Sequence, residues 1–360
     1  MRVVIGYEIF SAQRAGGISR YFTCLHDEFV EMGVDSHLVA GVHDNRIVHS
    51  HPRVHELRLR RAPRILYRSA DRLLAPIFEE ALVRGQRPSI YHRTYFHRPP
   101  PRRSTAVAIT IHDTIMLRHA EFVDVAPAMR RALKAGCDAA DAIFTPSSYT
   151  RDCIVDELGV DDERIVITPH GVKPAILEDH AERPRSSILF IGQRSVRYKN
   201  FSVFVEGVAQ SQGGASCPLV LFGGGSLTPG ETELLDRHGL LGRTVVSGGD
   251  DAALWRALRD AALLVVPSLE EGFGLPVLEG MAAGCPVVCS TGGALPEVGG
   301  NATVFFDPTD PGQLAEAIDR ILDDSQFRER LVAAGRQRAE QFTWRKTAEL
   351  TLDGYRRSLT

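Results

Sequence analysis

Long apolar runs are missing from this 360-residue sequence. Its composition, 44% hydrophobic and 24% charged, is ordinary for a folded globular protein, and no stretch approaches the roughly 20 consecutive apolar residues that span a bilayer. The opening residues, MRVVIGYEIF, lead straight into a strand-like pattern and contain no apolar signal-peptide core. We therefore expect a cytoplasmic protein.

Cysteine is scarce, and its spacing argues against both disulfides and zinc. The six cysteines form no Cys-x-x-Cys pair, and most stand in apolar surroundings, as reduced thiols in a folded core do. Cys285 and Cys289 share one face of an expected strand, but no histidine stands near them in the sequence, so no zinc site is expected.

Motifs of several other protein classes are also missing. The sequence contains neither the phosphate loop G-x-x-x-x-G-K-[ST] nor the hydrolase elbow G-x-S-x-G, and no later glycine completes a dinucleotide-binding fingerprint after residues 223–225. The net charge is −3, and no surface of interleaved basic and aromatic residues is evident. Nucleic acid is therefore not an expected partner.

What the sequence does contain is a regular alternation of strand-like runs and helical stretches, which restarts after residue 171. Roughly 100–200 residues form a typical domain, so the length suggests two. The alternation predicts two doubly wound α/β domains with parallel sheets covered on both faces. Strands are expected at 3–6, 106–111, 142–146, 165–168, 188–191, 219–222, 244–246, 263–266, 286–289 and 304–306, and helices at 18–32, 128–139, 150–158, 201–209, 252–261, 275–283, 312–322, 327–341 and 344–356.

The densest signal lies between Val266 and Val298, in VPSLEEGFGLPVLEGMAAGCPVVCSTGGALPEV. A strand leads into a glycine-containing loop and then into a helix with Pro276 in its first turn, where proline is tolerated. The start of such a helix favours an anion, most naturally a phosphate. Glu271 and Glu279 suit hydroxyl groups of a sugar and a ribose, although each carboxylate alone could equally be a solvated charge.

The segment EGFGLPVLEGMAAGCPV resembles the signature of retaining glycosyltransferases of family four, which have the GT-B fold. Two glutamates separated by seven residues enclose the GFGLP core. The resemblance implies two Rossmann-like domains facing a central cleft. It gives an N-terminal domain at 1–170 on the acceptor side and a C-terminal domain at 171–342 on the donor side. A last helix, 343–360, would pack back on the first domain.

The resemblance extends to the first domain. Gly16 and Gly17, in GGISRY, look like the family's N-terminal glycine loop, although a tight turn would also explain them. His112 looks like the family's strand-end histidine, which bonds the donor sugar, although a lone histidine there is often structural. His92 and Tyr95 resemble another segment of related enzymes and rank below His112. His170 stands in Pro169-His170-Gly171-Val172 where the family usually has asparagine, and an interdomain turn is the simpler interpretation.

A basic loop follows the first strand of the second domain, in GQRSVRYKN. Lys199 matches one member of the family's diphosphate-holding pair, and Arg194 is the best match for the other, with Arg197 as the weaker candidate. A loop of this kind is often merely solvated. Near a helix start it becomes a phosphate clamp.

The resemblance implies an activity. The enzyme would move a hexose from a nucleoside-diphosphate sugar, with GDP-mannose-like donors favoured, to a glycan or lipid-linked hydroxyl, with retention. No Asp-x-Asp triplet occurs, so neither metal nor cofactor is expected. Arg194 and Lys199 would hold the diphosphate, Glu271 and His112 the sugar, and Glu279 the ribose. Backbone contacts are expected at Gly16, Gly17, Gly272, Phe273, Gly274 and Leu275.

Two alternatives remain open. A sugar-nucleotide epimerase or a phosphorylase of the same fold would share the phosphate clamp, and a non-catalytic binding protein would bind the donor without converting it. An epimerase would need no acceptor, and a phosphorylase would need inorganic phosphate.

Arginines recur at intervals of four in the first domain, at Arg60, Arg64, Arg68 and Arg72, with apolar residues on the opposite helical face. The simpler interpretation is a solvated surface helix. The alternative is peripheral contact with anionic lipid at the inner face of the cytoplasmic membrane.

Overall fold

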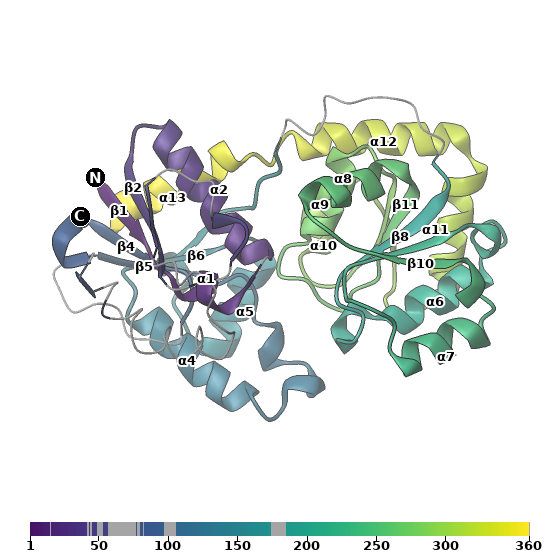
Figure 1. The fold of residues 1–360 in the computed structure, drawn as a ribbon, viewed down its shortest axis with the longest axis horizontal. Coiled ribbons are helices and arrows are strands. Elements are labelled where there is room, and N and C mark those ends of the chain that lie inside the picture. The colour runs from purple at the N-terminus through teal and green to yellow at the C-terminus, as the bar shows by residue number, and fades with distance from the viewer. Residues whose placement is uncertain are drawn as a thin grey trace. The chain divides into compact units, whose positions relative to one another are not determined.

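The chain forms two units in the computed structural model, which describes residues 1–14, 16–41, 43, 45–48, 53–56, 77, 80–81, 83–96, 106–173 and 185–359 (Figure 1). Unit 1 comprises Met1–Arg118, Phe122–Gly171 and Trp344–Thr360, and unit 2 comprises His119–Glu121 and Val172–Thr343. The predicted basic helix with Arg60, Arg64, Arg68 and Arg72 lies outside the described residues.

Unit 1 is built on a seven-stranded sheet in the order β3-β2-β1-β4-β5-β6-β7, with every pair parallel. Its first six strands follow the 3-2-1-4-5-6 order of a Rossmann fold. Apolar residues fill the strand centres because both faces are covered. The strands are β1 (Arg2–Ile5), β2 (Asp35–Gly41), β3 (Val54–Glu56), β4 (Ile90–Arg93), β5 (Ala106–Thr110), β6 (Ala142–Thr145) and β7 (Ile165–Ile167).

The described helices of unit 1 include the last helix of the chain. They are α1 (Glu8–Ala12), α2 (Gly17–Glu31), α4 (Ala126–Asp138), α5 (Ser148–Leu158) and α13 (Trp344–Ser358), with 3-10 turns η2 (Ile115–Leu117) and η4 (Asp162–Arg164). Helix α13 packs on α2, β6 and β7. A Cβ atom on Gly354 would lie 2.7 Å from Cζ of Phe144, so the helix needs glycine there to approach the sheet.

Unit 2 repeats the Rossmann order in a six-stranded parallel sheet, β10-β9-β8-β11-β12-β13. Its strands are β8 (Ser187–Ile191), β9 (Leu219–Phe222), β10 (Thr244–Ser247), β11 (Ala261–Val266), β12 (Val287–Ser290) and β13 (Val304–Phe306). Its helices are α6 (Phe201–Gln210), α7 (Pro229–Arg237), α8 (Asp251–Asp260), α9 (Leu275–Ala282), α10 (Leu295–Gly299), α11 (Pro311–Asp323) and α12 (Ser325–Ala339), with 3-10 turns η6 (Arg197–Lys199), η7 (Gly214–Ser216) and η8 (Leu241–Arg243). The prediction of two doubly wound α/β domains is confirmed.

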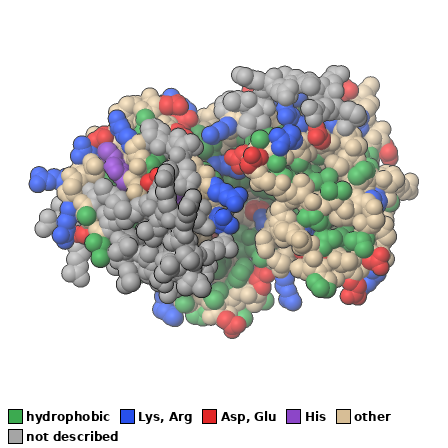
Figure 2. Space-filling model, viewed as in Figure 1, with side chains coloured by type: hydrophobic (Ala, Val, Ile, Leu, Met, Phe, Trp, Pro, Cys, Tyr) green, Lys and Arg blue, Asp and Glu red, His purple; other side chains and the backbone are tan. Residues whose placement is uncertain are grey.

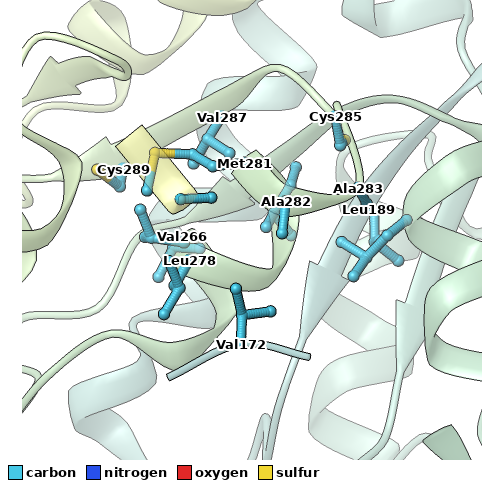
Figure 3. Packing of buried hydrophobic residues seen from close by; sticks show 14 of the residues in the cluster. Val172, Leu189, Val266, Leu278, Met281, Ala282, Ala283, Cys285, Val287 and Cys289 are labelled. Atoms are coloured by element: carbon cyan, nitrogen blue, oxygen red, sulfur yellow. The ribbon is translucent and has the colours of Figure 1, made fainter. Parts of the chain in front are cut away.

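Helix α9 is the most deeply packed helix near the predicted site. Figure 3 shows Leu278 and Met281 of this helix beside Val266 of β11 and Val287 of β12. A Cβ atom on Gly280 would lie 2.8 Å from Cγ2 of Val287, so the glycine permits close approach to the sheet. The start of α9 is therefore fixed by the core of unit 2.

The surface carries side chains of both charge signs over its described part (Figure 2). No helix among the described residues combines the length and apolarity that crossing a bilayer requires.

Candidate active site

The largest group of predicted site residues lies at the carboxyl ends of β8 and β11. These neighbouring strands form the point in unit 2 where the strand order reverses, and doubly wound sheets bind their ligands there. The segment after β8 carries Arg194 and Lys199. The segment after β11 carries Glu271 and the glycines that precede α9.

The start of α9 depends on Gly274. This residue is the N-cap in a left-handed conformation, with φ 104° and ψ 47°, and a Cβ atom there would lie 2.7 Å from Cδ2 of Leu295. Leu275 and Pro276 begin the helix, whose first turn provides the positive end of the helix dipole. The start of a helix can bind an anion through its free N–H groups.

Replacing Gly274 by Ala should lower the free energy of unfolding of unit 2 by about 1–3 kcal/mol, because the positive φ and the Leu295 contact both oppose a side chain. Denaturant unfolding followed by fluorescence would measure it. Gly230→Ala, in α7, is the matched control: nothing lies within 4 Å of its added Cβ. An equal effect of both substitutions would contradict the argument.

Lys199 and Glu271 form an ion pair at this point. The Lys199 ammonium donates to Oε1 of Glu271 at 2.6 Å, and the Ser268 hydroxyl donates to the same oxygen at 2.6 Å. The side chains of Lys199 and Glu271 are 15% and 11% exposed, so the pair is shielded yet reachable from solvent. A cation, a carboxylate and a helix start therefore meet in one place.

Residues that sequence reasoning missed hold this pair in place. The Asn200 amide donates to the carbonyls of Pro267, at 3.0 Å, and Pro308, at 2.7 Å, which ties the Lys199 turn to the end of β11. Leu269 N–H donates to the Tyr198 carbonyl at 2.7 Å. A Cβ atom on Gly293 would lie 2.6 Å from the Glu271 nitrogen. The available signals were the asparagine directly after Lys199 and the paired glycines after β12.

Arg194 is placed differently from Lys199. Its guanidinium is buried and donates to the carbonyls of Gly223, at 2.5 Å, Gly225, at 2.6 Å, and Ser226, at 3.3 Å. Its Nε lies 3.4 Å from Oε1 of Glu231. The arginine thus binds the glycine-rich turn after β9, where Gly223, Gly224 and Gly225 all have positive φ.

The other predicted contacts of unit 2 lie along the loop and α9. Glu279 is buried in the second turn of α9, 6% exposed. Phe273 is buried with its ring centroid 5.9 Å from that of Phe342, so its side chain belongs to the core. Gly272 precedes it in the same loop.

In unit 1, Gly16 and Gly17 begin α2. Gly16 is an extended N-cap residue, and Gly17 is the first helical residue. The Asn45 amide braces the turn by donating to the carbonyl of Gln13 at 2.7 Å and the hydroxyl of Ser19 at 2.9 Å. The glycine loop is therefore built as the start of a helix near the carboxyl end of β1.

His112 follows β5 and lines a pocket of unit 1. The pocket, with about 450 Å³ of empty space including open solvent, is mostly apolar. Its lining residues are Ile18, Tyr95, Phe96, Thr110, Ile111, His112, Asp113, Thr114, Met116, Met129 and Leu133. One imidazole, one carboxylate and the hydroxyls of Tyr95, Thr110 and Thr114 therefore belong to residues of a mostly apolar lining.

Aromatic rings enclose the His112 imidazole. Its centroid lies 4.9 Å from that of Tyr21 and 5.8 Å from that of Phe22, both edge-on. Nδ1 lies 3.4 Å from Nε2 of His170, whereas the buried Nε2 has no hydrogen-bond partner among the described residues. Desolvation lowers the pKa of His112 to about 3, so the ring is neutral at pH 7.

His92 and Tyr95 lie in different surroundings. His92 is buried in the core, with Nδ1 2.5 Å from the Tyr355 hydroxyl and Nε2 2.8 Å from Oγ1 of Thr110. Burial lowers its pKa to about 3. Tyr95 lines the pocket, and its ring stacks on Phe96 at 4.2 Å. His92 is therefore placed as a structural group, and Tyr95 as a wall of the pocket.

The depressed histidine pKa values predict acid sensitivity of unit 1. Between about pH 6 and 4, each such histidine takes up a proton in the unfolded chain but not in the folded one, so stability falls with falling pH by about 1.4 kcal/mol per unit per histidine. Burial raises the pKa of Glu8, which acts in the opposite direction. His112→Asn should therefore reduce the slope by up to about 1.4 kcal/mol per unit relative to the parent.

The slope is measurable because the chain has two tryptophans, one in each unit. In a Trp255→Phe background, the fluorescence of buried Trp344 reports unfolding of unit 1. Equal slopes for the parent and His112→Asn would show that the pKa of this histidine is the same in the folded and the unfolded chain.

The described residues contain no group of three or more His, Cys, Asp or Glu side chains that could hold a metal ion. The Lys199 ammonium is a cationic group that lies against Glu271 in the segment before α9.

Family models cover most of the chain. The model "Glycosyltransferase Family 4" matches residues 15–175, and "Glycosyl transferases group 1" matches residues 172–338. An O-antigen chain mannosyltransferase B of Escherichia coli is 29% identical over 83% of this chain and 81% of its own length. An MMP alpha-(1->4)-mannosyltransferase of Mycolicibacterium hassiacum is 33% identical over 60% of this chain and 54% of its own length.

Solved structures share the fold. A sucrose-phosphate synthase of Thermosynechococcus elongatus has a TM-score of 0.78 at 21% identity, covering 99% of this chain and 98% of that chain. Anabaena HepE in complex with UDP and glucose has a TM-score of 0.75 at 15% identity, covering 98% of this chain and 99% of that chain.

Proposed function

Because the chain belongs to the glycosyltransferases of family 4 and is an enzyme of the GT-B fold, we propose that it transfers a hexose, with retention and without a metal, from a nucleoside-diphosphate sugar to a hydroxyl of a glycan or a lipid-linked acceptor. Two similar proteins are named mannosyltransferases, which supports mannose as the sugar and a GDP-mannose-like donor.

The observation that carries the proposal is the Lys199–Glu271 pair beside the start of α9. In the free protein the ammonium and the carboxylate neutralise each other. A donor diphosphate would attract the ammonium and lie at the helix start, which would free Glu271 to accept hydrogen bonds from sugar hydroxyls. The departing diphosphate then meets a fixed positive charge without a metal ion.

The remaining site residues take supporting parts. Glu279 would bind the ribose, and Gly272, Phe273 and Leu275 would offer backbone contacts. The N–H groups of Arg194 are directed to backbone carbonyls. Arg194 would therefore affect binding of the sugar nucleotide by shaping the turn at residues 223–226 rather than by direct contact. In unit 1, His112 would bond the donor sugar, and Gly16 and Gly17 would let the loop approach the diphosphate and acceptor.

The transfer of the sugar to the acceptor needs no nucleophilic side chain from the enzyme. The bond from the anomeric carbon to the diphosphate oxygen breaks, and the bond to the acceptor oxygen forms on the same face. The acceptor proton passes to the departing phosphate. Positioning and charge stabilisation are then the tasks of the protein.

The test is a panel of GDP- and UDP-sugars incubated with the protein in EDTA, with and without short glycan acceptors. We expect acceptor-dependent release of nucleoside diphosphate from one donor, lost in Glu271→Ala, and an anomeric configuration conserved in the product by NMR. Conversion without acceptor would indicate an epimerase, and a need for inorganic phosphate would indicate a phosphorylase. Binding without turnover would contradict the proposal.

Peripheral contact with anionic membrane through Arg60, Arg64, Arg68 and Arg72 is a further part of the proposal, supported by the sequence pattern alone. Vesicle flotation tests it. Equal recovery with neutral and anionic vesicles would contradict it.

A further inference from the structure

His170 lies beside His112 in unit 1. Its position is held by contacts that a simple turn does not require. It is 4% exposed, and its ring centroid lies 4.9 Å from that of Tyr21 and 5.9 Å from that of Trp344. The preceding carbonyl, that of Pro169, accepts a hydrogen bond from the Thr347 hydroxyl of α13. The backbone and the ring are therefore both held, and Nε2 lies 3.4 Å from Nδ1 of His112.

Both imidazoles are neutral at pH 7, because burial lowers the pKa of His170 well below its usual range and that of His112 to about 3. A contact between two neutral imidazole nitrogens requires one to carry a proton and the other to be free of it. The proton on one nitrogen of a ring fixes whether the other nitrogen donates or accepts. The contact therefore decides the chemistry of Nε2 on His112.

We propose that His170 is a positioning residue: its Nε2–H donates to Nδ1 of His112, so that His112 carries its proton on Nε2 and presents a hydrogen-bond donor. The same contact, with the edge-on rings of Tyr21 and Phe22, fixes the plane of the His112 ring. Nε2 of His112 is buried and has no hydrogen-bond partner among the described residues, and it would donate to an oxygen atom of a sugar bound in the pocket that His112 lines.

The direction of this hydrogen bond and the contact with a sugar both rest on the proposed function, whereas the contact between the two rings does not. Another side chain that can donate a hydrogen bond to Nδ1 of His112 should be able to take over the role of His170. Glutamine can place its amide N–H where Nε2 of His170 lies, so His170→Gln should preserve the tautomer, and His170→Ala should release it.

Long-range ¹H–¹⁵N correlation spectra of the labelled, ligand-free protein test the tautomer directly. The His112 signals are assigned by their loss in His112→Asn. We expect a protonated Nε2 and an unprotonated Nδ1 in the parent and in His170→Gln, and a mixture of tautomers in His170→Ala. His92→Asn controls for general loosening of unit 1 and should leave the His112 signals unchanged. A protonated Nδ1 in the parent, or unchanged signals in His170→Ala, would overturn the proposal.

Kinetics test the consequence. With a donor identified by the panel, His170→Ala should lower kcat/KM by about tenfold or more, and His170→Gln should recover it to within roughly threefold. Parent-like activity of His170→Ala would remove the positioning role. If the parent itself transfers no sugar, the proposed function fails, and the spectra still decide the tautomer.

Discussion

Lys199→Ala should lower kcat/KM for the sugar donor by about 10²–10³-fold. The ammonium is the positive side chain placed against Glu271 beside the α9 start. The diphosphate gains charge as its bond to the sugar breaks, and one fixed donor in such a site is worth about this factor. Because the charge develops mainly in the transition state, kcat should fall more than donor affinity. Steady-state kinetics and donor titration measure the two quantities.

The substitution also leaves a carboxylate without its cation. Glu271 would keep the hydrogen bond from Ser268 but lose the ammonium at 2.6 Å. Lys199→Ala/Glu271→Gln separates this secondary effect, because it removes the uncompensated charge as well as the ammonium. If the double variant recovers turnover, charge imbalance and not loss of the diphosphate ligand caused the defect. Lys199→Arg keeps the charge and should retain more activity than Lys199→Ala.

Much of unit 2 could be predicted because its signals are local. The β11 strand is an unbroken apolar run, and Gly274 and Pro276 mark the following helix start within a few residues. Because the Glu271 loop directly follows a predicted strand, the doubly wound fold places it at the carboxyl end of that strand. The pairing of Lys199 with Glu271 follows from topology, because β8 and β11 are neighbours in the sheet.

The sequence patterns did not predict helices and strands whose apolar pattern is weak or interrupted by polar residues. Strand β2 contains Asp35, Ser36 and His37, and it is a strand because its buried residues pack beside β1. Helix α7 has few apolar residues, and its signal was instead the capping box of Thr228 and Glu231. The secondary structure of such segments is determined by their packing against the rest of the fold.

The contacts of Arg194 and His170 could not be derived from their own neighbourhoods. The Arg194 carbonyl partners stand 29–32 residues away, and they face the guanidinium because three consecutive glycines adopt positive φ. His170 meets His112 from 58 residues away. A basic or imidazole side chain at a strand end suggests a ligand from sequence alone. Only the fold shows whether the protein itself provides the partner.

Arg194→Ala should lower the free energy of unfolding of unit 2 by about 3–5 kcal/mol, because the substitution leaves Glu231 and three carbonyls facing an empty space. In a Trp344→Phe background, buried Trp255 of α8 reports this transition in denaturant. Arg237→Ala, which breaks an exposed pair with Glu233, is the matched control and should change stability by less than about 1 kcal/mol.

A third variant separates support of the turn from diphosphate binding by Arg194. Glu231→Gln keeps the bond to Thr228 N–H, because glutamine also serves in a capping box, but removes the charge facing the guanidinium. If Arg194 supports the turn, Glu231→Gln and Arg194→Ala should both destabilise unit 2 and weaken donor binding in proportion. If Arg194 holds the diphosphate directly, as the basic loop alone suggests, Arg194→Ala should abolish turnover at nearly unchanged stability. The arginine binds three backbone carbonyls within a buried site, so the first outcome is expected.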